Sequence, residues 1–162
     1  MEVVIIKYNA GNIESVCNAL HRLGVQAEVT DDPERIRAAD RVIFPGVGEA
    51  ANTMAYLRAR GLDGVIRSLT QPVLGICLGL QLMCAHSEEG DTPCLGIFGE
   101  VVHKFVSAPG REHVDKVPHM GGNAIYHLKG EFSLPQWNTS MFTSYILIMP
   151  KRANTPRPCA TI

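Results

Sequence analysis

The residues best suited to chemistry lie at 75–79, in the stretch Gly-Ile-Cys-Leu-Gly. This stretch follows a predicted buried strand and precedes a predicted helix, which is the layout of a nucleophile elbow with Cys77 in place of serine. The turn is sharp, and side chains two residues before and after the nucleophile would collide, so Gly75 and Gly79 fit it. Cys77 is then expected at the carboxyl edge of a sheet, where the helix dipole favours thiolate and the Leu78 amide faces an oxyanion.

A second glycine-containing loop, Pro-Gly-Val-Gly at 45–48, follows the neighbouring predicted strand. The strands of an open parallel sheet end at one edge, and such folds place their ligands there. Both loops are therefore expected to open on the same edge, which favours a site. Each loop also has a plainer interpretation, because free cysteine is among the most buried residue types and a glycine loop is often an ordinary turn.

The segments around these loops alternate between strand-like and helix-like patterns. Continuous apolar runs predict strands, and apolar residues at helical spacing predict helices. This alternation predicts a three-layer α/β fold, with a mostly parallel sheet, right-handed crossovers and helices on both faces. The predicted strands are 3–6, 26–30, 41–44 and 73–76; the predicted helices run from 13 to a stop at Gly24, from Asp32 and Pro33, over about 52–69 with a break at Gly61, and over 78–86.

The second half of the chain has a different character. Alternation over 97–106 predicts an antiparallel strand, and a turn is predicted over 118–123. Beyond residue 137 the sequence is rich in Thr and Ser, with an apolar run at 146–149. The last segment, 151–162, is predicted to be unfolded by itself.

The composition describes one globular domain. The chain has 162 residues, 15 Lys and Arg against 16 Asp and Glu, a net charge of −1 and 46% hydrophobic residues. The hydrophobic residues supply enough apolar surface for a core. The sequence lacks the clusters of Lys and Arg that a nucleic-acid-binding protein needs. The apolar stretch 73–85 is too short for a membrane span and no export signal is present, so a cytoplasmic location is expected. The five cysteines form neither a zinc pattern nor a disulfide framework, and free thiols are expected.

Five segments form an ordered set of motifs: 7–12 (Lys-Tyr-Asn-Ala-Gly-Asn), 44–48 (Phe-Pro-Gly-Val-Gly), 75–82 (Gly-Ile-Cys-Leu-Gly-Leu-Gln-Leu), 86–90 (His-Ser-Glu-Glu-Gly) and 118–121 (Pro-His-Met-Gly). Together they resemble the triad-type, or class I, glutamine amidotransferases, and within these the glutaminase subunits of imidazole glycerol phosphate synthases. The resemblance covers roughly the first 130 residues. It implies a flavodoxin-like α/β fold, C-terminally incomplete, with a partial type-1 amidotransferase domain over 1–137.

The resemblance implies a reaction at Cys77. Its sulfur attacks the side-chain amide of L-glutamine, forms a γ-glutamyl thioester and releases ammonia, after which water frees glutamate. Gln81 and Glu89 match positions that hold the glutamine. Without the resemblance, Gln81 could be a solvated position, and Glu88 and Glu89 could be surface charges.

The resemblance also implies an oxyanion site and a partner surface. The oxyanion site consists of backbone groups of Leu78, Gly46, Val47 and Gly48, and in the family the loop at 46–48 becomes competent when the partner is occupied. Asn12 and His119 match segments that face this partner, a (β/α)8-barrel cyclase that receives the ammonia in a cytoplasmic heterodimer of histidine biosynthesis. No cofactor and no metal are implied. His119 could equally be a structural turn residue.

The chain departs from the family where the catalytic base is expected. A cysteine nucleophile needs a histidine base, which the family carries in a downstream His-Pro-Glu motif that is missing here. No histidine follows His127, and Gly122 stands where the family has Trp. A shifted frame from Asn138 can read much like the family's next strand, so 138–162 is predicted to be a divergent, out-of-frame tail. Loss of the base predicts about 10²- to 10⁴-fold lower activity, and loss of late strands predicts an exposed apolar sheet edge and poor solubility.

Three alternatives stay open. The chain could be a non-catalytic module that binds the cyclase and hydrolyses nothing, a member of another amidotransferase branch, or an unrelated cysteine hydrolase with the same elbow. The turn at 118–121 favours the imidazole glycerol phosphate synthase branch.

Overall fold

The structure is a computed structural model that describes residues 1–8, 12–103, 123–124, 141–142 and 146–149. The chain divides into two compact units, one of residues 1–104 with 146–161 and one of residues 105–145 with 162. The first unit contains the main sheet and its helices, and in the second the structure describes one short strand pair.

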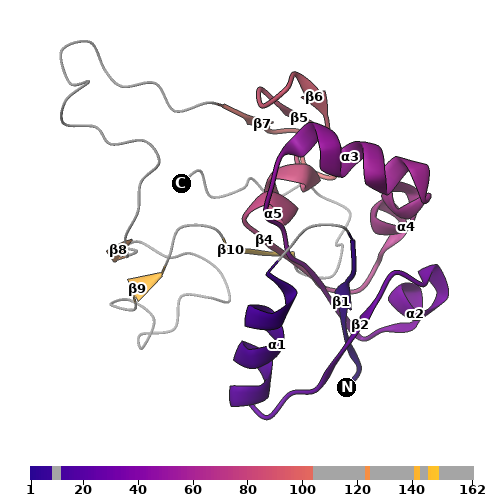
Figure 1. Cartoon of the computed structure of the whole chain (residues 1–162), viewed down its shortest axis with the longest axis vertical. Coiled ribbons are helices and arrows are strands. Elements are labelled where there is room, and N and C mark those ends of the chain that lie inside the picture. Colours follow the sequence, from indigo (N-terminus) through magenta and orange to yellow (C-terminus); the bar gives the residue numbers. More distant parts are fainter. Residues whose placement is uncertain (9–11, 104–122, 125–140, 143–145, 150–162) are drawn as a thin grey trace. The chain divides into compact units, whose positions relative to one another are not determined.

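The first unit is built on a five-stranded sheet with the strand order β10-β4-β3-β1-β2 (Figure 1). β1 pairs in parallel with β2 and β3, and β3 pairs in parallel with β4, as the alternating pattern predicts. The four predicted strands are confirmed. They are β1 (Val3–Ile6), β2 (Ala27–Thr30), β3 (Arg41–Phe44) and β4 (Val73–Ile76).

The fifth strand, β10 (Ile146–Met149), is antiparallel to β4, with Ile146 opposite Ile76 and Met149 opposite Val73. It lies within 138–162, the segment predicted to be an out-of-frame tail. The edge of β4 is therefore paired, and the expectation of an exposed apolar edge is wrong at β4. Backbone pairing needs only an extended segment with free donors and acceptors, which the apolar run supplies.

The five helices of the first unit agree with the predicted segments, with one exception. The side chains of Asn12 and Asp32 cap the first two helices, accepting hydrogen bonds from Ser15 N at 3.2 Å and Glu34 N at 2.8 Å. Gly61, with φ of +67°, separates the next two, as predicted. The helices are α1 (Ile13–Arg22), α2 (Pro33–Ala38), α3 (Ala50–Ala59), α4 (Leu62–Ser68) and α5 (Leu78–Met83).

The exception is α5, because the prediction of a helix over 78–86 is wrong after Met83. The Met83 carbonyl accepts hydrogen bonds from Ile97 N at 2.9 Å and Phe98 N at 3.0 Å. Ala85 N then donates to Glu100 O at 2.9 Å. Pairing with a distant segment thus overrides the helical periodicity of these residues.

The residues after α5 form a small sheet with the order β6-β5-β7. β5 (His86–Ser87) is antiparallel to β6 (Thr92–Pro93) and parallel to β7 (Val101–Val102). The predicted antiparallel strand over 97–106 is therefore wrong among the described residues, since 97–100 form no strand and β7 pairs in parallel. The amides of 97 and 98 bind the end of α5 instead, and 104–106 lie outside the described residues.

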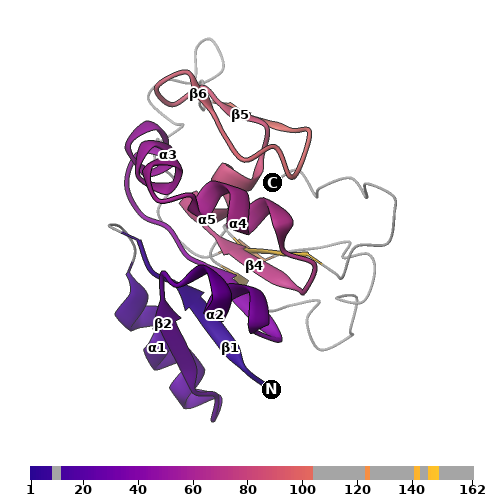
Figure 2. The ribbon, with the colours of Figure 1, turned by 90° about the vertical axis from the view of Figure 1, so that its right-hand side faces the viewer.

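Helices cover both faces of the main sheet (Figures 1 and 2). α1 packs on one face, where its half-buried apolar side chains contact buried Val3, Ile5 and Ile43. α2, α3, α4 and α5 pack on the other face and enclose the larger core. The fully buried side chains of that core include Ile6, Ile36, Phe44, Met54, Leu57, Ile66 and Leu82. The three-layer α/β fold is confirmed.

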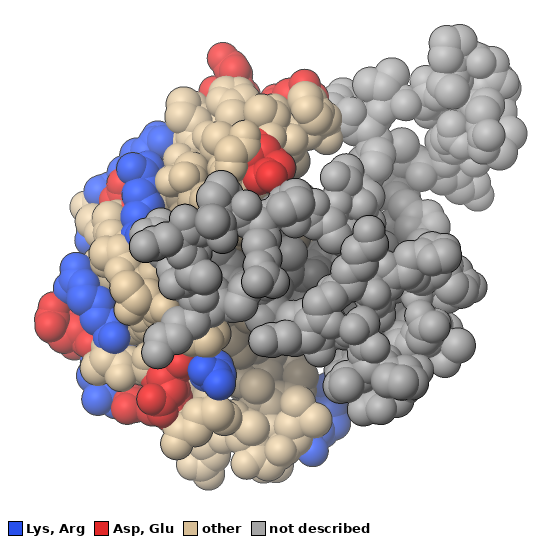
Figure 3. Space-filling model, turned by 180° about the vertical axis from the view of Figure 1, so that it is seen from behind, with Lys and Arg blue, Asp and Glu red and all other residues tan. Residues whose placement is uncertain are grey.

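In the second unit, β8 (Asn123–Ala124) is antiparallel to β9 (Met141–Phe142). Asn123 pairs with Phe142, so the predicted turn is wrong at its last residue, while 118–122 and 151–162 lie outside the described residues. No helix among the described residues combines the length and the apolar character that crossing a membrane requires. On the face drawn in Figure 3, side chains of both charge signs lie interspersed over the described surface.

Candidate active site

Cys77 lies at the sharp turn between β4 and α5, at the carboxyl end of β4. Its backbone has φ of +51° and ψ of −117°, a conformation that is strained for a residue with a side chain. The thiol is free and the residue is half-buried. The elbow that residues 75–79 predict is therefore confirmed as backbone geometry.

The two glycines of the elbow are required by space. A Cβ on Gly75 would lie 2.9 Å from both Leu80 Cα and Met83 Sδ, and a Cβ on Gly79 would overlap the Phe44 carbonyl oxygen. A close-packed interior has no room to relieve such overlaps. Gly79 therefore allows the start of α5 to approach the end of β3, from which the second glycine loop leaves.

The loop 45–48 lies directly against this elbow. A Cβ on Gly46 would lie 2.8 Å from Leu78 Cβ and would overlap Gly79 N. Val47 next to it is 49% exposed. Leu78 is the first residue of α5, where an amide has no acceptor within its own helix. The structure thus brings the two glycine loops together at one edge of the sheet, as predicted.

Tyr8, for which no role was predicted, joins the site from the end of β1. It is 5% exposed, its ring lies 5.6 Å from that of Phe44, and its hydroxyl donates a hydrogen bond to Pro45 O. Burial raises the pKa of Tyr8 well above its ordinary range, and the charge of Cys77 raises it further. The sequence signal is a tyrosine two residues after a buried strand, at the edge where both loops open.

The two predicted glutamine ligands have different surroundings. Gln81 lies in α5, four residues after Cys77, and its backbone N–H donates to Cys77 O at 3.1 Å. The carboxylate of Glu89 accepts a hydrogen bond from Ala50 N at 3.0 Å and so caps the amino end of α3. Ala50 follows the loop 45–48 closely, so this contact places the Glu89 carboxylate near that loop.

Of the two residues predicted to contact the partner, the structure describes only Asn12. Asn12 is exposed, and its side chain has the local role of capping α1. His119 lies outside the described residues.

Two histidines near the small sheet pair with carboxylates. His86 Nε2 lies 3.0 Å from Asp91 Oδ1, and His103 Nδ1 lies 2.8 Å from Glu88 Oε1. Within the part of the chain that the structure describes, no hydrogen bond joins a histidine to Cys77. The same residues contain no cluster of three or more His, Cys, Asp or Glu side chains that could hold a metal ion.

The elbow and its glycine loop occur in a chain that belongs to the class-I glutamine amidotransferase family. The family model described as "Glutamine amidotransferase class-I" matches residues 4–145. The predicted resemblance is therefore confirmed at the level of the family.

Curated relatives of this chain carry a more specific name, "Imidazole glycerol phosphate synthase subunit HisH". The protein of that name from Bacteroides fragilis is 61% identical over 131 residues, which cover 81% of this chain and 65% of the relative. That from Bacteroides thetaiotaomicron is 60% identical over 125 residues, 77% of this chain and 62% of the relative. That from Idiomarina loihiensis is 48% identical over 125 residues, 77% of this chain and 61% of the relative. The chain thus spans less than two thirds of the length of these relatives.

Proposed function

We propose that this chain is a partial glutaminase subunit of an imidazole glycerol phosphate synthase, which converts L-glutamine and water to glutamate and ammonia. The observation that carries the proposal is Cys77, held in a strained elbow with the loop 45–48 packed against it. Membership of the family and the printed name of the relatives support the substrate and the assembly.

The proposed reaction begins at the Cys77 sulfur. Its thiolate attacks the side-chain amide carbon of glutamine, and an electron pair of the carbonyl moves to the oxygen. The oxyanion then collapses, the C–N bond breaks, and the nitrogen takes up a proton and leaves as ammonia. Water adds to the resulting γ-glutamyl thioester, the C–S bond breaks, and glutamate and the Cys77 thiolate are released.

Backbone groups would bind the oxyanion of both steps. We assign this role to the Leu78 N–H and to the backbone of Gly46, Val47 and Gly48, because donors that are fixed before the reaction need no reorganisation during it. The exposed position of Val47 leaves the loop accessible to a partner, in line with a loop that becomes competent on assembly.

We assign the binding of glutamine to Gln81 and Glu89. The backbone N–H of Gln81 binds Cys77 O, so Gln81 is close enough for its side chain to contact a substrate held at the sulfur. The Glu89 carboxylate can accept from Ala50 N and from a substrate ammonium group together, because it offers about four lone-pair sites. No metal and no cofactor enter the proposed steps.

The ammonia would pass to a (β/α)8-barrel cyclase subunit in a cytoplasmic heterodimer of histidine biosynthesis. Asn12 and His119 are the proposed contacts to this partner. The relatives' name, which describes a synthase subunit, supports such an assembly.

The proton transfers need a base that this chain lacks in the His-Pro-Glu form. We propose that the amidotransferase domain ends at residue 137, that 138–162 is an out-of-frame tail, and that activity is about 10²- to 10⁴-fold below that of an intact relative. Resequencing the locus past codon 137 tests whether the tail is out of frame. An unbroken frame with no downstream His-Pro-Glu coding in any register would contradict it.

A second candidate is a module that binds the cyclase and hydrolyses nothing. The observation that favours it is the pairing of His86 and His103 with carboxylates, with no histidine hydrogen-bonded to Cys77 among the described residues.

A glutaminase assay with the cyclase and its nucleotide present distinguishes the two candidates. The proposed enzyme should release glutamate at a low rate that Cys77→Ser abolishes and Cys17→Ser preserves; Cys17 is the matched control because it is also a half-buried free thiol. Glutamate release that survives Cys77→Ser would contradict the enzyme. Cyclase binding with no glutamate release from any form would establish the binding module.

A further inference from the structure

Tyr8 is buried beside the candidate active site, and the reaction proposed above gives it no task. Its side chain is 5% exposed and packs against the ring of Phe44. A buried tyrosine hydroxyl normally finds a hydrogen-bond partner, and here the partner is the carbonyl oxygen of Pro45, the first residue of the loop 45–48. One end of this contact therefore belongs to the loop that carries the proposed oxyanion groups.

This hydrogen bond orients one peptide group of the loop. A trans peptide is planar, so the Pro45 carbonyl and the Gly46 N–H point in opposite directions. Because the carbonyl is turned to the Tyr8 hydroxyl, the Gly46 N–H is turned away from it. A Cβ on Gly46 would lie 2.7 Å from Tyr8 Oη and 2.8 Å from Leu78 Cβ, so the hydroxyl and the elbow both pack close to Gly46.

The hydroxyl also stays protonated in this position. Burial raises the pKa of Tyr8, and the nearby charge of Cys77 raises it further. Tyr8 therefore remains a hydrogen-bond donor at neutral pH, where the assay is run.

We propose that Tyr8 is a positioning residue, whose hydroxyl holds the Pro45–Gly46 peptide so that the backbone of the loop 45–48 is ready to bind the oxyanion of a Cys77 adduct. The inference rests on the proposed function and deepens it. Tyr8 acts through the loop, and its contribution is to reduce the number of loop conformations that compete with the binding-competent one.

The test uses the full chain, assembled with the cyclase and its nucleotide as in the glutaminase assay, and the open-chain form of L-glutamate γ-semialdehyde, an aldehyde analogue of glutamine. The Cys77 thiolate adds to the aldehyde carbon and the carbonyl electron pair moves to the oxygen, so the anion of a hemithioacetal forms at the loop and nothing is released. Tyr8→Phe removes only the hydroxyl. Tyr8→Phe should weaken aldehyde binding about tenfold, because the loop 45–48 would then lose its hydrogen-bond donor and would have to become ordered when the aldehyde binds.

Alkylation of Cys77 by iodoacetamide is the internal control. This displacement creates no oxyanion at the loop, so Tyr8→Phe should change its rate by less than about twofold. Tyr56→Phe is the matched control variant, because Tyr56 lies on α3 with its ring against Arg60, and it should change neither quantity.

Two outcomes separate this inference from the proposed function. Equal aldehyde affinity in Tyr8→Phe and the unaltered chain would overturn the role of Tyr8 and leave the glutaminase site standing. An unaltered chain that binds no aldehyde, although iodoacetamide alkylates Cys77, would overturn the glutaminase site and this inference together.

A measurement on the unaltered chain covers the case in which Tyr8→Phe does not fold. With ¹³C at tyrosine Cζ and ¹⁵N in glycine, NMR spectra should show the Gly46 and Gly48 amide resonances moving when the aldehyde is added. The Tyr8 Cζ resonance should stay in place, because its hydrogen bond persists. A shift of that resonance toward the value of a solvated phenol would show that the loop must leave Tyr8 to bind, which overturns the proposal.

Discussion

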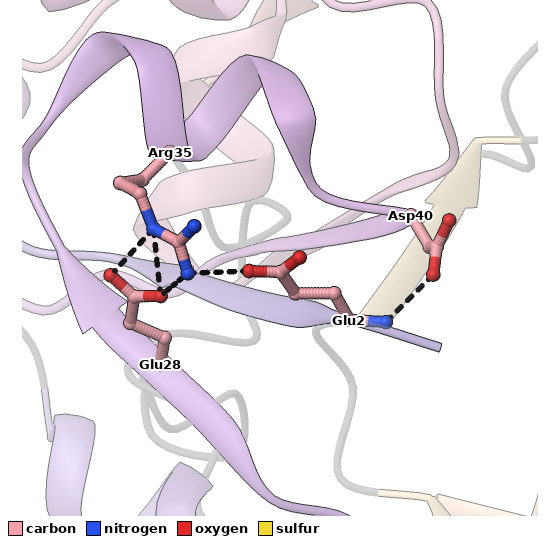
Figure 4. Close-up of polar contacts among 4 residues, drawn as sticks. All are labelled: Glu2, Glu28, Arg35 and Asp40. Atoms are coloured by element: carbon pink, nitrogen blue, oxygen red, sulfur yellow. Dashed lines mark hydrogen bonds and ion pairs between the residues drawn. The ribbon is translucent and has the colours of Figure 1, made fainter.

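The two ends of the main sheet hold their side chains in opposite ways. Near the amino ends of the strands, Arg35 forms ion pairs with Glu28 and Glu2, the latter at 2.6 Å, and Glu2 N donates to Asp40 Oδ2 at 2.7 Å (Figure 4). These four side chains are all more than a third exposed. At the carboxyl ends, the elbow of Cys77, the loop 45–48 and the Tyr8 ring meet in buried contacts.

The exposed ion pairs at the amino end only link neighbouring elements, whereas the buried contacts at the carboxyl end build the candidate site. Exposed ion pairs contribute little stability and weaken in salt, so the amino end should tolerate substitution. The carboxyl end depends on backbone segments that approach each other where only glycine fits, and there a single methyl group should disturb both stability and reactivity. Substitutions at the two ends measure this contrast.

The largest effect is expected from Gly79→Ala, which places a Cβ on the Phe44 carbonyl oxygen. The free energy of unfolding should fall by about 3 kcal/mol, because neither backbone segment can move aside without displacing β3 or α5. Urea denaturation measures this change. Gly64→Ala is the control, since a Cβ at that helical position meets nothing within 4 Å and should stabilise the chain by about 0.5 to 1 kcal/mol. Equal effects of both variants would contradict the account.

Cys77→Gly tests whether the elbow stores strain. Glycine adopts a φ of +51° without a penalty, so the free energy of unfolding should rise by about 1 kcal/mol while the nucleophile is lost. Cys17→Gly should instead lower it by about 1 kcal/mol, because Cys17 lies within α1. A lower free energy of unfolding for Cys77→Gly would show that the backbone at Cys77 stores no strain.

Glu89 separates a structural from a substrate-binding contribution within the carboxyl end. Glu89→Ala should lower the free energy of unfolding by about 0.5 to 1 kcal/mol, because Ala50 N loses its acceptor, whereas the amide oxygen of Glu89→Gln can still accept that bond. Glu89→Gln should therefore keep the stability and lose affinity for glutamine, measured by calorimetry. Unchanged glutamine affinity in Glu89→Gln would remove Glu89 from the proposed substrate site.

The smallest effect is expected at the amino end. The hydrogen bond from Arg35 holds the pKa of Glu28 below its ordinary value of 4.5. A carboxyl group with a lowered pKa in the folded state stabilises the fold above its unfolded pKa, and this contribution is lost as the pH falls through the folded pKa. Glu28→Gln should therefore lower Tm by about 1 °C at neutral pH, and this difference should shrink as the pH falls below 4.5 and vanish in molar salt. A fall in Tm of several degrees that persists in salt would show that the amino end tolerates substitution no better than the elbow does.

The same contrast explains what could be predicted from the sequence. The strands, the cap at Asp32, the break at Gly61 and the elbow follow from residues close together in the chain, and they are confirmed. The Tyr8–Pro45 and Glu89–Ala50 hydrogen bonds join residues 37 and 39 positions apart, so no local pattern marks them. The end of α5 at Met83 is of the same kind, because distant amides at 97 and 98 bind its carbonyl.

The most direct test of the central claim, that the elbow presents Cys77 to the side chain of glutamine, is peptide-mapped alkylation of the full chain by 6-diazo-5-oxo-L-norleucine, a glutamine-like electrophile. Cys77 should be labelled at least about 100-fold faster than Cys17, because a bound reagent reacts at high effective concentration, and L-glutamine should protect it. Labelling of Cys77 at the rate of Cys17, unaffected by L-glutamine, would contradict the account.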